Sequence, residues 1–132
     1  MIIVLDTNIW ISLAINRQLE FVADLHQNGT VIASCETLLN ELIAVLGRPK
    51  FQKTFTRSYI ESFILFHQLA TTSGKLTTIE SVVSDEKDNY LFALCLVSKA
   101  DYFITGDKLL LAVKNYNRTS VLSLAEFKAI IV

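Results

Sequence analysis

The sequence predicts an α/β fold, a three-layer α/β/α sandwich with a central, mostly parallel sheet of about five strands. Three observations lead to this prediction. Short apolar runs alternate with segments of helical spacing, which is the pattern of a parallel sheet covered by helices. The first run, Ile2–Leu5, is apolar at four consecutive positions, as in strands that are buried on both faces. Asp6 and Asp107 each come at the end of an apolar run, and open parallel sheets bind ligands at the carboxyl ends of their strands.

The composition is that of a folded chain, and we expect one domain over residues 1–132. Hydrophobic residues make up 52% of the chain and charged residues 19%, which argues against disorder. No apolar run reaches the roughly 18 residues of a membrane span, and Asp6 comes too early for a signal peptide, so we expect a cytoplasmic protein without membrane contact. Cys35 and Cys95 lie in apolar segments and are expected to be buried thiols. The net charge of −1 implies that any binding to nucleic acid depends on a local patch.

Strands are expected at short runs rich in Ile, Val, Thr and aromatic residues: 2–5, 30–33, 75–79, 102–104 and 120–122. The run 75–79 is the weakest of these because Thr dominates it, and the residues before it, Thr71–Gly74, have the composition of a turn.

Helices are expected where apolar residues recur every three or four positions. The first begins near Ile9 and continues at helical spacing to Asn28–Gly29, a good stop signal. Ser34 or Thr37 can cap the second, which Gly47 and Pro49 end. Further helices are predicted at 58–70, at 84–99, from 107 onward and through 127. The two helices between 37 and 70 form a longer excursion than a crossover needs, so we interpret them as a helical arm beside the site.

The acidic residues have two possible interpretations. Asp6 and Asp107 can each be the N-cap of a helix, and Asp85 and Asp88 suit the positive end of a helix dipole. Alternatively, two strand ends and one helix start converge at the same edge of the sheet, and the acids share one site.

Glu41 lies at the border of the apolar stripe of its helix, where a carboxylate is partly desolvated unless it has a partner. Only Arg48, beyond the helix end, is a nearby basic partner, and a solvated surface glutamate is the alternative. Several carboxylates at one point repel one another, and the usual remedy is a divalent cation with oxygen ligands, Mg²⁺ or Mn²⁺. Zinc is disfavoured because neither the cysteines nor His26 and His67 have ligand spacing. Carboxylates with Mg²⁺ suit phosphoryl chemistry.

A basic segment without acids extends from residue 48 to residue 57. Its bases form a candidate RNA-binding surface: Arg48, Lys50, Lys53 and Arg57. Aromatic residues interleave at four-residue spacing: Phe51, Phe55 and Tyr59. The alternative is that the aromatic rings pack the arm while the bases are merely solvated.

The chain resembles the PIN-domain ribonucleases, particularly the VapC-type toxins of bacterial toxin–antitoxin pairs, from Met1 to about Phe127. Four motifs carry this resemblance: Val4-Leu5-Asp6-Thr7-Asn8, Asn40-Glu41-Leu42, Asp85-Glu86-Lys87-Asp88-Asn89 and Phe103-Ile104-Thr105-Gly106-Asp107. The resemblance implies a parallel sheet between helices and Mg²⁺- or Mn²⁺-dependent cleavage of RNA. It also implies a homodimer and a small antitoxin whose tail blocks the site.

The resemblance implies a catalytic, metal-binding set of four acids: Asp6, Glu41, Asp88 and Asp107. It implies residues that hold the acids by hydrogen bonds: Thr7, Asn8 and Thr105, with Asn89 assisting. Asp85 is a rival or a helper of Asp88. Some relatives have a further acid where this chain has Ala93, which leaves the number of bound metal ions open.

The sequence therefore predicts a metal-dependent endoribonuclease, the toxin of a toxin–antitoxin pair. One alternative is a PIN-like domain that binds RNA or a partner without cutting. Another is a signalling receiver domain, which also holds Mg²⁺ at strand ends. A receiver needs two adjacent acids after its first strand, whereas Asp6 stands alone before Thr7-Asn8, and it needs a lysine that Leu122-Ser123-Leu124 does not supply.

Overall fold

The computed structural model describes residues 1–131, and within them six strands form one sheet in the order β3-β2-β1-β4-β6-β5. The strands are β1 (Ile2–Leu5), β2 (Val31–Ser34), β3 (Thr72–Ser73), β4 (Tyr102–Ile104), β5 (Asn115–Tyr116) and β6 (Thr119–Leu122). Neighbouring strands are parallel except β5 and β6, which form an antiparallel pair at one edge. The predicted fold class is confirmed, since the sheet is mostly parallel.

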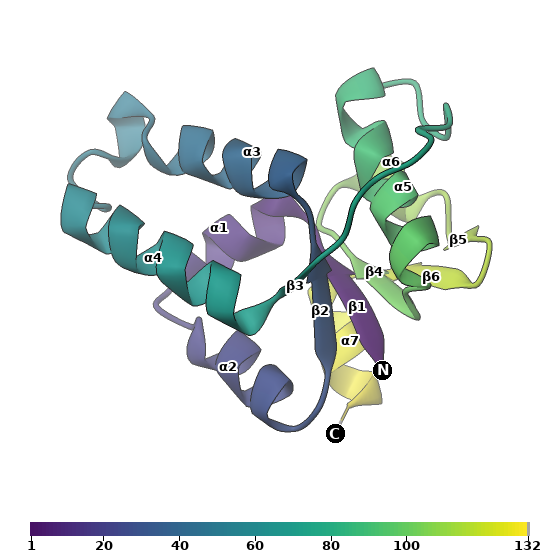
Figure 1. The fold of residues 1–132 in the computed structure, drawn as a ribbon, viewed down its shortest axis with the longest axis horizontal. Helices are drawn as coiled ribbons and strands as arrows, with labels where there is room; N and C mark the ends of the chain where they lie inside the picture. Colours follow the sequence, from purple (N-terminus) through teal and green to yellow (C-terminus); the bar gives the residue numbers. More distant parts are fainter. Residues whose placement is uncertain (132) are drawn as a thin grey trace.

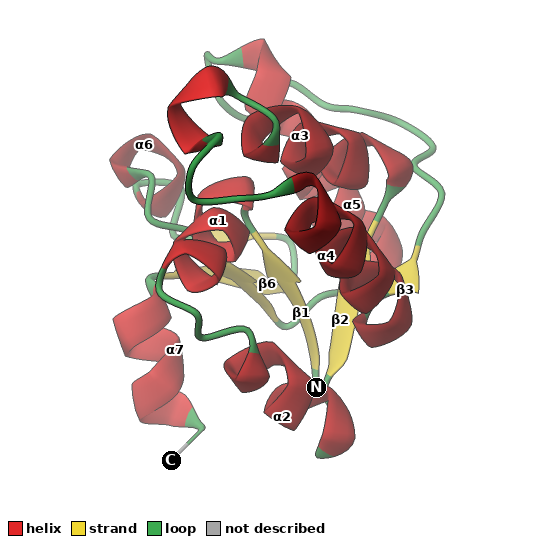
Figure 2. Ribbon diagram, turned by 90° about the vertical axis from the view of Figure 1, so that its left-hand side faces the viewer, coloured by secondary structure: helices red, strands yellow, loops and turns green. Residues whose placement is uncertain are grey.

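Helices cover both faces of this sheet (Figures 1 and 2). They are α1 (Thr7–Ile15), α2 (Glu20–Gln27), α3 (Glu36–Leu46), α4 (Arg57–Ala70), α5 (Asn89–Ser98), α6 (Lys108–Leu111) and α7 (Leu124–Ile130), with the 3₁₀ turns η1 (Pro49–Phe51) and η2 (Glu86–Asp88). In Figure 2, α1, α2 and α7 lie in front of the strands and α5 lies behind them. Figure 1 shows α3 and α4 side by side, extending away from the sheet as an arm. Within residues 1–131, none of the helices is long and apolar enough to cross a membrane.

The strand order reverses at β1, and this places the site. The chain leaves β1 toward β2 and β3, and then returns across the sheet to β4 and β6. In the parallel ladders, Val4 of β1 is in register with Ala33 of β2 on one side and with Phe103 of β4 on the other. The connections that follow β1 and β4 therefore diverge at their carboxyl ends, where open α/β sheets form their ligand-binding crevice.

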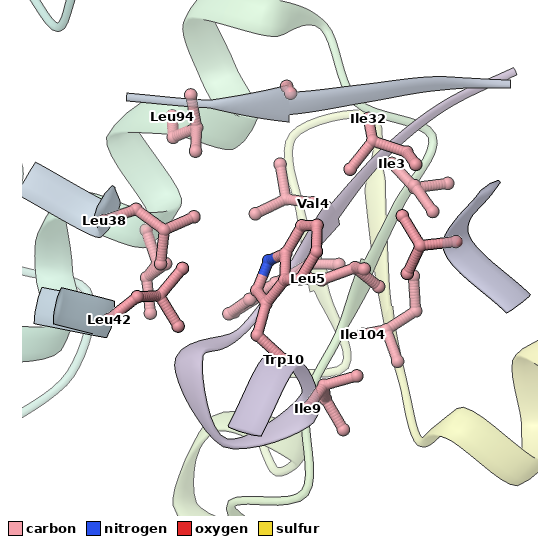
Figure 3. Packing of buried hydrophobic residues seen from close by; sticks show 14 of the residues in the cluster. Ile3, Val4, Leu5, Ile9, Trp10, Ile32, Leu38, Leu42, Leu94 and Ile104 are labelled. Carbon is pink, nitrogen blue, oxygen red and sulfur yellow. The ribbon is translucent and has the colours of Figure 1, made fainter. Parts of the chain in front are cut away.

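Trp10 of α1 anchors the arm to the sheet. Its side chain is fully buried. Figure 3 shows the indole with Leu38 and Leu42 of α3 on one side and with Val4 and Leu5 of β1 on the other. Because a buried aromatic ring makes a large contribution to core packing, this cluster fixes α3 relative to β1. Glu41 lies on the same helix, so the packing also fixes the position of its backbone.

Two predicted helices are divided in the structure. The helix expected from residue 9 to residue 28 is two helices, α1 and α2. The side chain of Asn16 donates to the carbonyl of Ser12 over 2.9 Å, and Arg17 adopts a left-handed φ of 54°. Asparagine competes for the backbone in this way and ends helices, although the apolar spacing continues beyond it. The helix expected from 84 to 99 begins with the 3₁₀ turn η2, and α5 starts only at Asn89.

The segment after α4 also differs from the prediction. Residues 75–79 are not a strand, and the short strand β3 instead uses Thr72 and Ser73, which were predicted to be in a turn. The Thr-rich run has little apolar surface to bury, so its β propensity does not recruit it to the sheet. Neither predicted residue caps α3: Cys35 is the N-cap, and the Ser34 hydroxyl lies 2.7 Å from Nε2 of His67.

Candidate active site

A cleft of about 460 Å³ brings acidic side chains from separate parts of the chain together. The acids in its lining are Asp6, Glu41, Asp85, Asp88 and Asp107. They come from the end of β1, from the middle of α3, from the turn before α5 and from the loop after β4. Within residues 1–131, no three Asp, Glu, His or Cys side chains are close enough to form a ready-made metal-binding group. The acids thus surround a cleft of open space.

Asp6 is the most deeply buried of these acids, with 5% of its surface exposed. It is the N-cap of α1, and its Oδ1 accepts a hydrogen bond from the N–H of Thr7 over 2.7 Å. Its Oδ2 accepts from the hydroxyl of Thr105 over 2.6 Å. Burial raises the pKa of Asp6 from 3.8 to about 6, and the charges of Asp88 and Glu41 add to the rise, while the two hydrogen bonds oppose it. A negative charge at this position is therefore costly unless a cation compensates it.

The loop after β4 is tied to the loop after β1. The hydroxyl of Thr105, which donates to Asp6, also accepts from the N–H of Asp107 over 3.0 Å. The N–H of Gly106 donates to the side chain of Asn8 over a longer 3.4 Å. Thr105 and Asn8 thus bind the two loops to each other, and Thr105 contacts both Asp6 and Asp107.

Asp107 combines a structural contact with a place in the cleft. Its Oδ1 accepts from the N–H of Leu109 over 2.9 Å, so it caps the short helix α6. Asp107 is thus both an N-cap and part of the cleft lining, and the cap uses only one of its two carboxylate oxygens.

Glu41 has a partner that the sequence did not indicate. The hydroxyl of Tyr90 donates to Oε2 of Glu41 over 2.5 Å, and Tyr90 is 5% exposed. Burial and the adjacent Glu41 both raise the pKa of Tyr90, so its hydroxyl keeps its proton. Arg48 also lines the cleft, but the bonded partner of Glu41 is the tyrosine. The sequence did contain a signal for this contact: Tyr90 places a hydroxyl two positions after Asp88, at the start of a largely apolar helix.

Asp88 and Asp85 differ in their surroundings. Asp88 is half-buried, and burial raises its pKa, as do the charges of Asp85 and Asp107, with Lys87 opposing and Glu41 adding a smaller effect. Asp85 is exposed and forms an ion pair with Lys87 at 3.7 Å. Asp88 therefore faces the other acids, while Asp85 lies at the rim.

The remaining predicted helpers, Thr7 and Asn89, are placed differently from each other. Thr7 lines the cleft, and its buried hydroxyl has no hydrogen-bond partner among the described residues. Such an unpaired group is costly unless water or a ligand completes it. The side chain of Asn89 accepts from the N–H groups of Val82 and Val83 over 3.0 and 2.9 Å. Asn89 therefore holds the segment that precedes η2, and its contact with the acids is indirect.

The basic segment divides into two parts. In the described chain, Arg48 and Lys50 line the cleft together with Phe51, whereas Lys53 and Arg57 are absent from its lining. Arg57 forms an exposed ion pair with Glu61 at 3.4 Å.

The aromatic rings of this segment form a ladder. Phe51 and Phe55 have ring centroids 5.3 Å apart, and Phe55 and Tyr59 are also 5.3 Å apart. Phe55 is 4% exposed, so the packing interpretation holds for this ring. Only the first ring of the ladder reaches the cleft.

Ala93 lies one turn into α5 and is 5% exposed. The position where some relatives have a further acid thus carries a small apolar side chain against the core. The atoms of the cleft that could bind a metal are carboxylate oxygens, with the unpaired hydroxyl of Thr7 nearby. Hard cations such as Mg²⁺ and Mn²⁺ prefer oxygen ligands of this kind.

Comparisons with known proteins agree with this fold. A sequence model described as the PIN domain matches residues 2–109. The structure resembles that of VapBC2 from Rickettsia felis bound to a DNA fragment from their promoter, with a TM-score of 0.62 and 15% sequence identity. That similarity covers 93% of this chain and 98% of the other chain, and at this identity it concerns the fold alone. A search of curated proteins gives no match.

Proposed function

Because the chain belongs to the PIN-domain family, we propose that it is a divalent-metal-dependent endoribonuclease that hydrolyses RNA phosphodiester bonds. PIN domains are generally nucleases. Membership in this family removes the receiver-domain alternative. Metal dependence and RNA as the substrate are the parts of the proposal that go beyond the family.

One observation carries the proposal: five carboxylates line a single cleft, and the most buried of them, Asp6, has a pKa raised to about 6 by its burial. Helix capping explains the position of Asp107 but not that of Glu41, which lies in the middle of α3. A bound cation would offset the repulsion among these groups. The oxygen donors and the unpaired hydroxyl of Thr7 fit a hard divalent cation.

We propose that four acids hold the metal and make up the catalytic set: Asp6, Glu41, Asp88 and Asp107. Asp85 lies at the rim, where it acts as a helper and not as a direct ligand. A bound Mg²⁺ or Mn²⁺ supplies charge neutralisation at the scissile phosphate and lowers the pKa of a water. Thr105 and Tyr90 hold the acids in place, and Arg48 and Lys50 bind phosphates beside the scissile bond.

The biological role that we propose is the toxin of a toxin–antitoxin pair. The fold resembles that of a chain in the VapBC2 structure, and this likeness supports a small cognate antitoxin as the partner. A homodimer and a cytoplasmic location complete the proposal. The location is supported by Cys35 and Cys95, which are both buried free thiols, as in proteins of reducing compartments.

A second candidate is a PIN-domain protein that binds RNA without cutting it. Ala93 favours this candidate, since the chain has one potential ligand fewer than some relatives. Five carboxylates still line the cleft, so we place cleavage first.

A cleavage assay distinguishes the two candidates. Labelled single-stranded RNA is incubated with the wild type in Mn²⁺, with the wild type in EDTA and with Asp107→Asn in Mn²⁺. The nuclease proposal predicts cleavage only in the first reaction. Binding of RNA without cleavage in any reaction supports the second candidate, and cleavage that persists in EDTA contradicts metal dependence.

A further inference from the structure

A single hydrogen bond joins the two helices on either side of the acid cleft. Tyr90 on α5 donates its hydroxyl to Oε2 of Glu41 on α3 over 2.5 Å, across 49 positions of sequence. The short distance is typical of a hydroxyl that donates to a charged carboxylate. The ring of Tyr90 is buried, so it cannot follow Glu41 if that side chain moves. The bond therefore connects the side chain of Glu41, which has several rotatable bonds, to the buried and immobile ring of Tyr90.

The ring of Tyr90 is close to another acid. Tyr90 is the second residue of α5, and Asp88 is the N-cap of that helix. Because Tyr90 is buried and lies two residues after Asp88, its ring is anchored close to the backbone of Asp88. The hydroxyl thereby ties the Glu41 carboxylate to the helix end that carries Asp88.

The bond also restrains the conformation of Glu41. Oε2 accepts from the tyrosine while the side chain lines the cleft, so the carboxylate is held beside the space where a cation would bind. A glutamate side chain has three rotatable bonds and loses considerable entropy when it is held in one conformation. In this protein the hydrogen bond restrains it before a ligand arrives, which reduces the cost of binding.

We propose that Tyr90 is a positioning residue, which restrains Glu41 beside Asp88 so that less rearrangement is needed when the cleft binds one divalent cation. This inference rests on the proposed function, because it assumes that the cleft binds a metal. Tyr90 acts through Glu41 and does not itself contact the cation.

The test measures binding of Mn²⁺ from the loss of the electron paramagnetic resonance signal of free Mn²⁺. Four proteins are titrated: the wild type, Tyr90→Phe, Glu41→Ala and the double variant. Residues that orient a metal ligand typically contribute 10- to 100-fold to affinity, so Tyr90→Phe should weaken the Mn²⁺ affinity about tenfold or more. In the Glu41→Ala background the same substitution should change the affinity less than twofold, because the hydrogen bond through which Tyr90 is proposed to act has already been removed.

The chain offers a matched control. The hydroxyl of Tyr116 donates to Oε1 of Glu80 over 2.6 Å, which is the same chemical pair away from the cleft. Tyr116→Phe should leave the Mn²⁺ affinity unchanged. Melting curves in EDTA establish that every variant is folded before titration.

Three outcomes overturn the inference, and one of them also overturns the proposed function. An unchanged affinity in Tyr90→Phe excludes a positioning role, while the metal-dependent function stands. An equal loss in the wild-type and Glu41→Ala backgrounds shows that Tyr90 acts on the fold and not through Glu41. Failure of the folded wild type to bind Mn²⁺ refutes the metal site itself, and the inference with it.

Discussion

The hydroxyl of Thr105 donates to Oδ2 of Asp6 over 2.6 Å, although 99 positions of sequence separate the two residues. The same hydroxyl accepts from the N–H of Asp107 over 3.0 Å. One buried oxygen atom therefore holds the carboxylate that ends β1 and the backbone of the acid that follows β4. This arrangement makes Thr105 a sensitive point at which to test the organisation of the cleft.

Thr105→Val keeps the shape of the side chain and removes both hydrogen bonds. We expect RNA cleavage in Mn²⁺ to fall about 10- to 100-fold, since Asp6 and Asp107 lose their common support. The matched control is Thr119→Val, because the buried Thr119 hydroxyl donates to the carbonyl of Ala100 over 2.7 Å away from the cleft. Both variants should lose about 1–3 kcal/mol of stability, and only Thr105→Val should lose activity. Equal activity in the two variants would contradict a special role for Thr105.

Asp6→Asn should change how metal-free stability depends on pH. The pKa of Asp6 is raised from 3.8 to about 6, so between these values the folded state binds more protons than the unfolded state. The charged carboxylate therefore destabilises the fold as pH rises through 6, and Asn lacks this effect. Relative to Asp6→Asn, the wild type should lose about 2–3 kcal/mol between pH 4 and pH 7.5.

Urea denaturation in EDTA at the two pH values measures this difference. Asn can still accept from the N–H of Thr7, but the Thr105 hydroxyl must then turn from donor to acceptor. That change alters the free energy of unfolding equally at both pH values. The difference in stability between the two pH values therefore reports the effect of the charge alone. A constant gap between the two proteins from pH 4 to pH 7.5 would show that Asp6 is not a strained carboxylate.

Much of the fold is encoded locally and could be predicted from the sequence. The apolar run Ile2–Leu5 is short and rich in β-branched residues, which favours a buried strand, and the periodicity of α3 and α4 predicts both helices within one or two residues. The prediction of the elements is wrong where a side chain competes for backbone hydrogen bonds, and where pairing with a neighbouring strand decides the structure. Asn16 ends α1 inside a continuous apolar pattern. Thr72 and Ser73 become a strand only because β2 offers an edge to pair with.

That the acids lie at one edge of the sheet could be predicted from the sequence, whereas the hydrogen bonds that hold them could not. Asp6 and Asp107 follow strands, so the rule of parallel sheets brings them to one edge. The bond between Tyr90 and Glu41 joins two helices whose separation depends on the packing of Trp10, and no local pattern encodes it. Asn89 follows Asp88 directly, yet its side chain turns to Val82 and Val83 because a loop there needs hydrogen-bond acceptors.

His67 should make the protein less stable in acid. It is 1% exposed, and burial lowers its pKa from 6.5 to about 4. Between these values the unfolded chain binds a proton that the folded state excludes, so stability falls as pH decreases. This trend opposes that of Asp6, and a substitution is needed to separate the two.

We therefore expect His67→Gln to remove about 2–3 kcal/mol of the stability loss between pH 7 and pH 4.5. Gln has no titrating group and retains an amide that can reach the Ser34 hydroxyl. The control is His26→Gln, which alters an exposed histidine on α2. If His26→Gln and His67→Gln reduce the loss equally, the effect does not come from burial of His67.

The basic segment should bind RNA through the residues that line the cleft. Arg48→Ala with Lys50→Ala should flatten the dependence of log affinity on log salt by about 1.4, because each phosphate contact to single strands contributes about 0.7. Lys53→Ala with Arg57→Ala removes the same charge from outside the cleft lining, and it should change the slope by less than about 0.7. Both pairs are titrated with labelled RNA in EDTA. Equal slopes for the two double variants would show that only net charge matters.

We propose that Asp6, Glu41, Asp88 and Asp107 hold a divalent cation. Anomalous scattering from crystals soaked in Mn²⁺ can locate this cation, because the signal marks the metal and the refined structure identifies its ligands. We expect an anomalous peak in the cleft within about 2–2.3 Å of carboxylate oxygens from Asp6 and at least two of the other three acids. An empty cleft at saturating Mn²⁺, or a peak bound only by Asp85 at the rim, would contradict it.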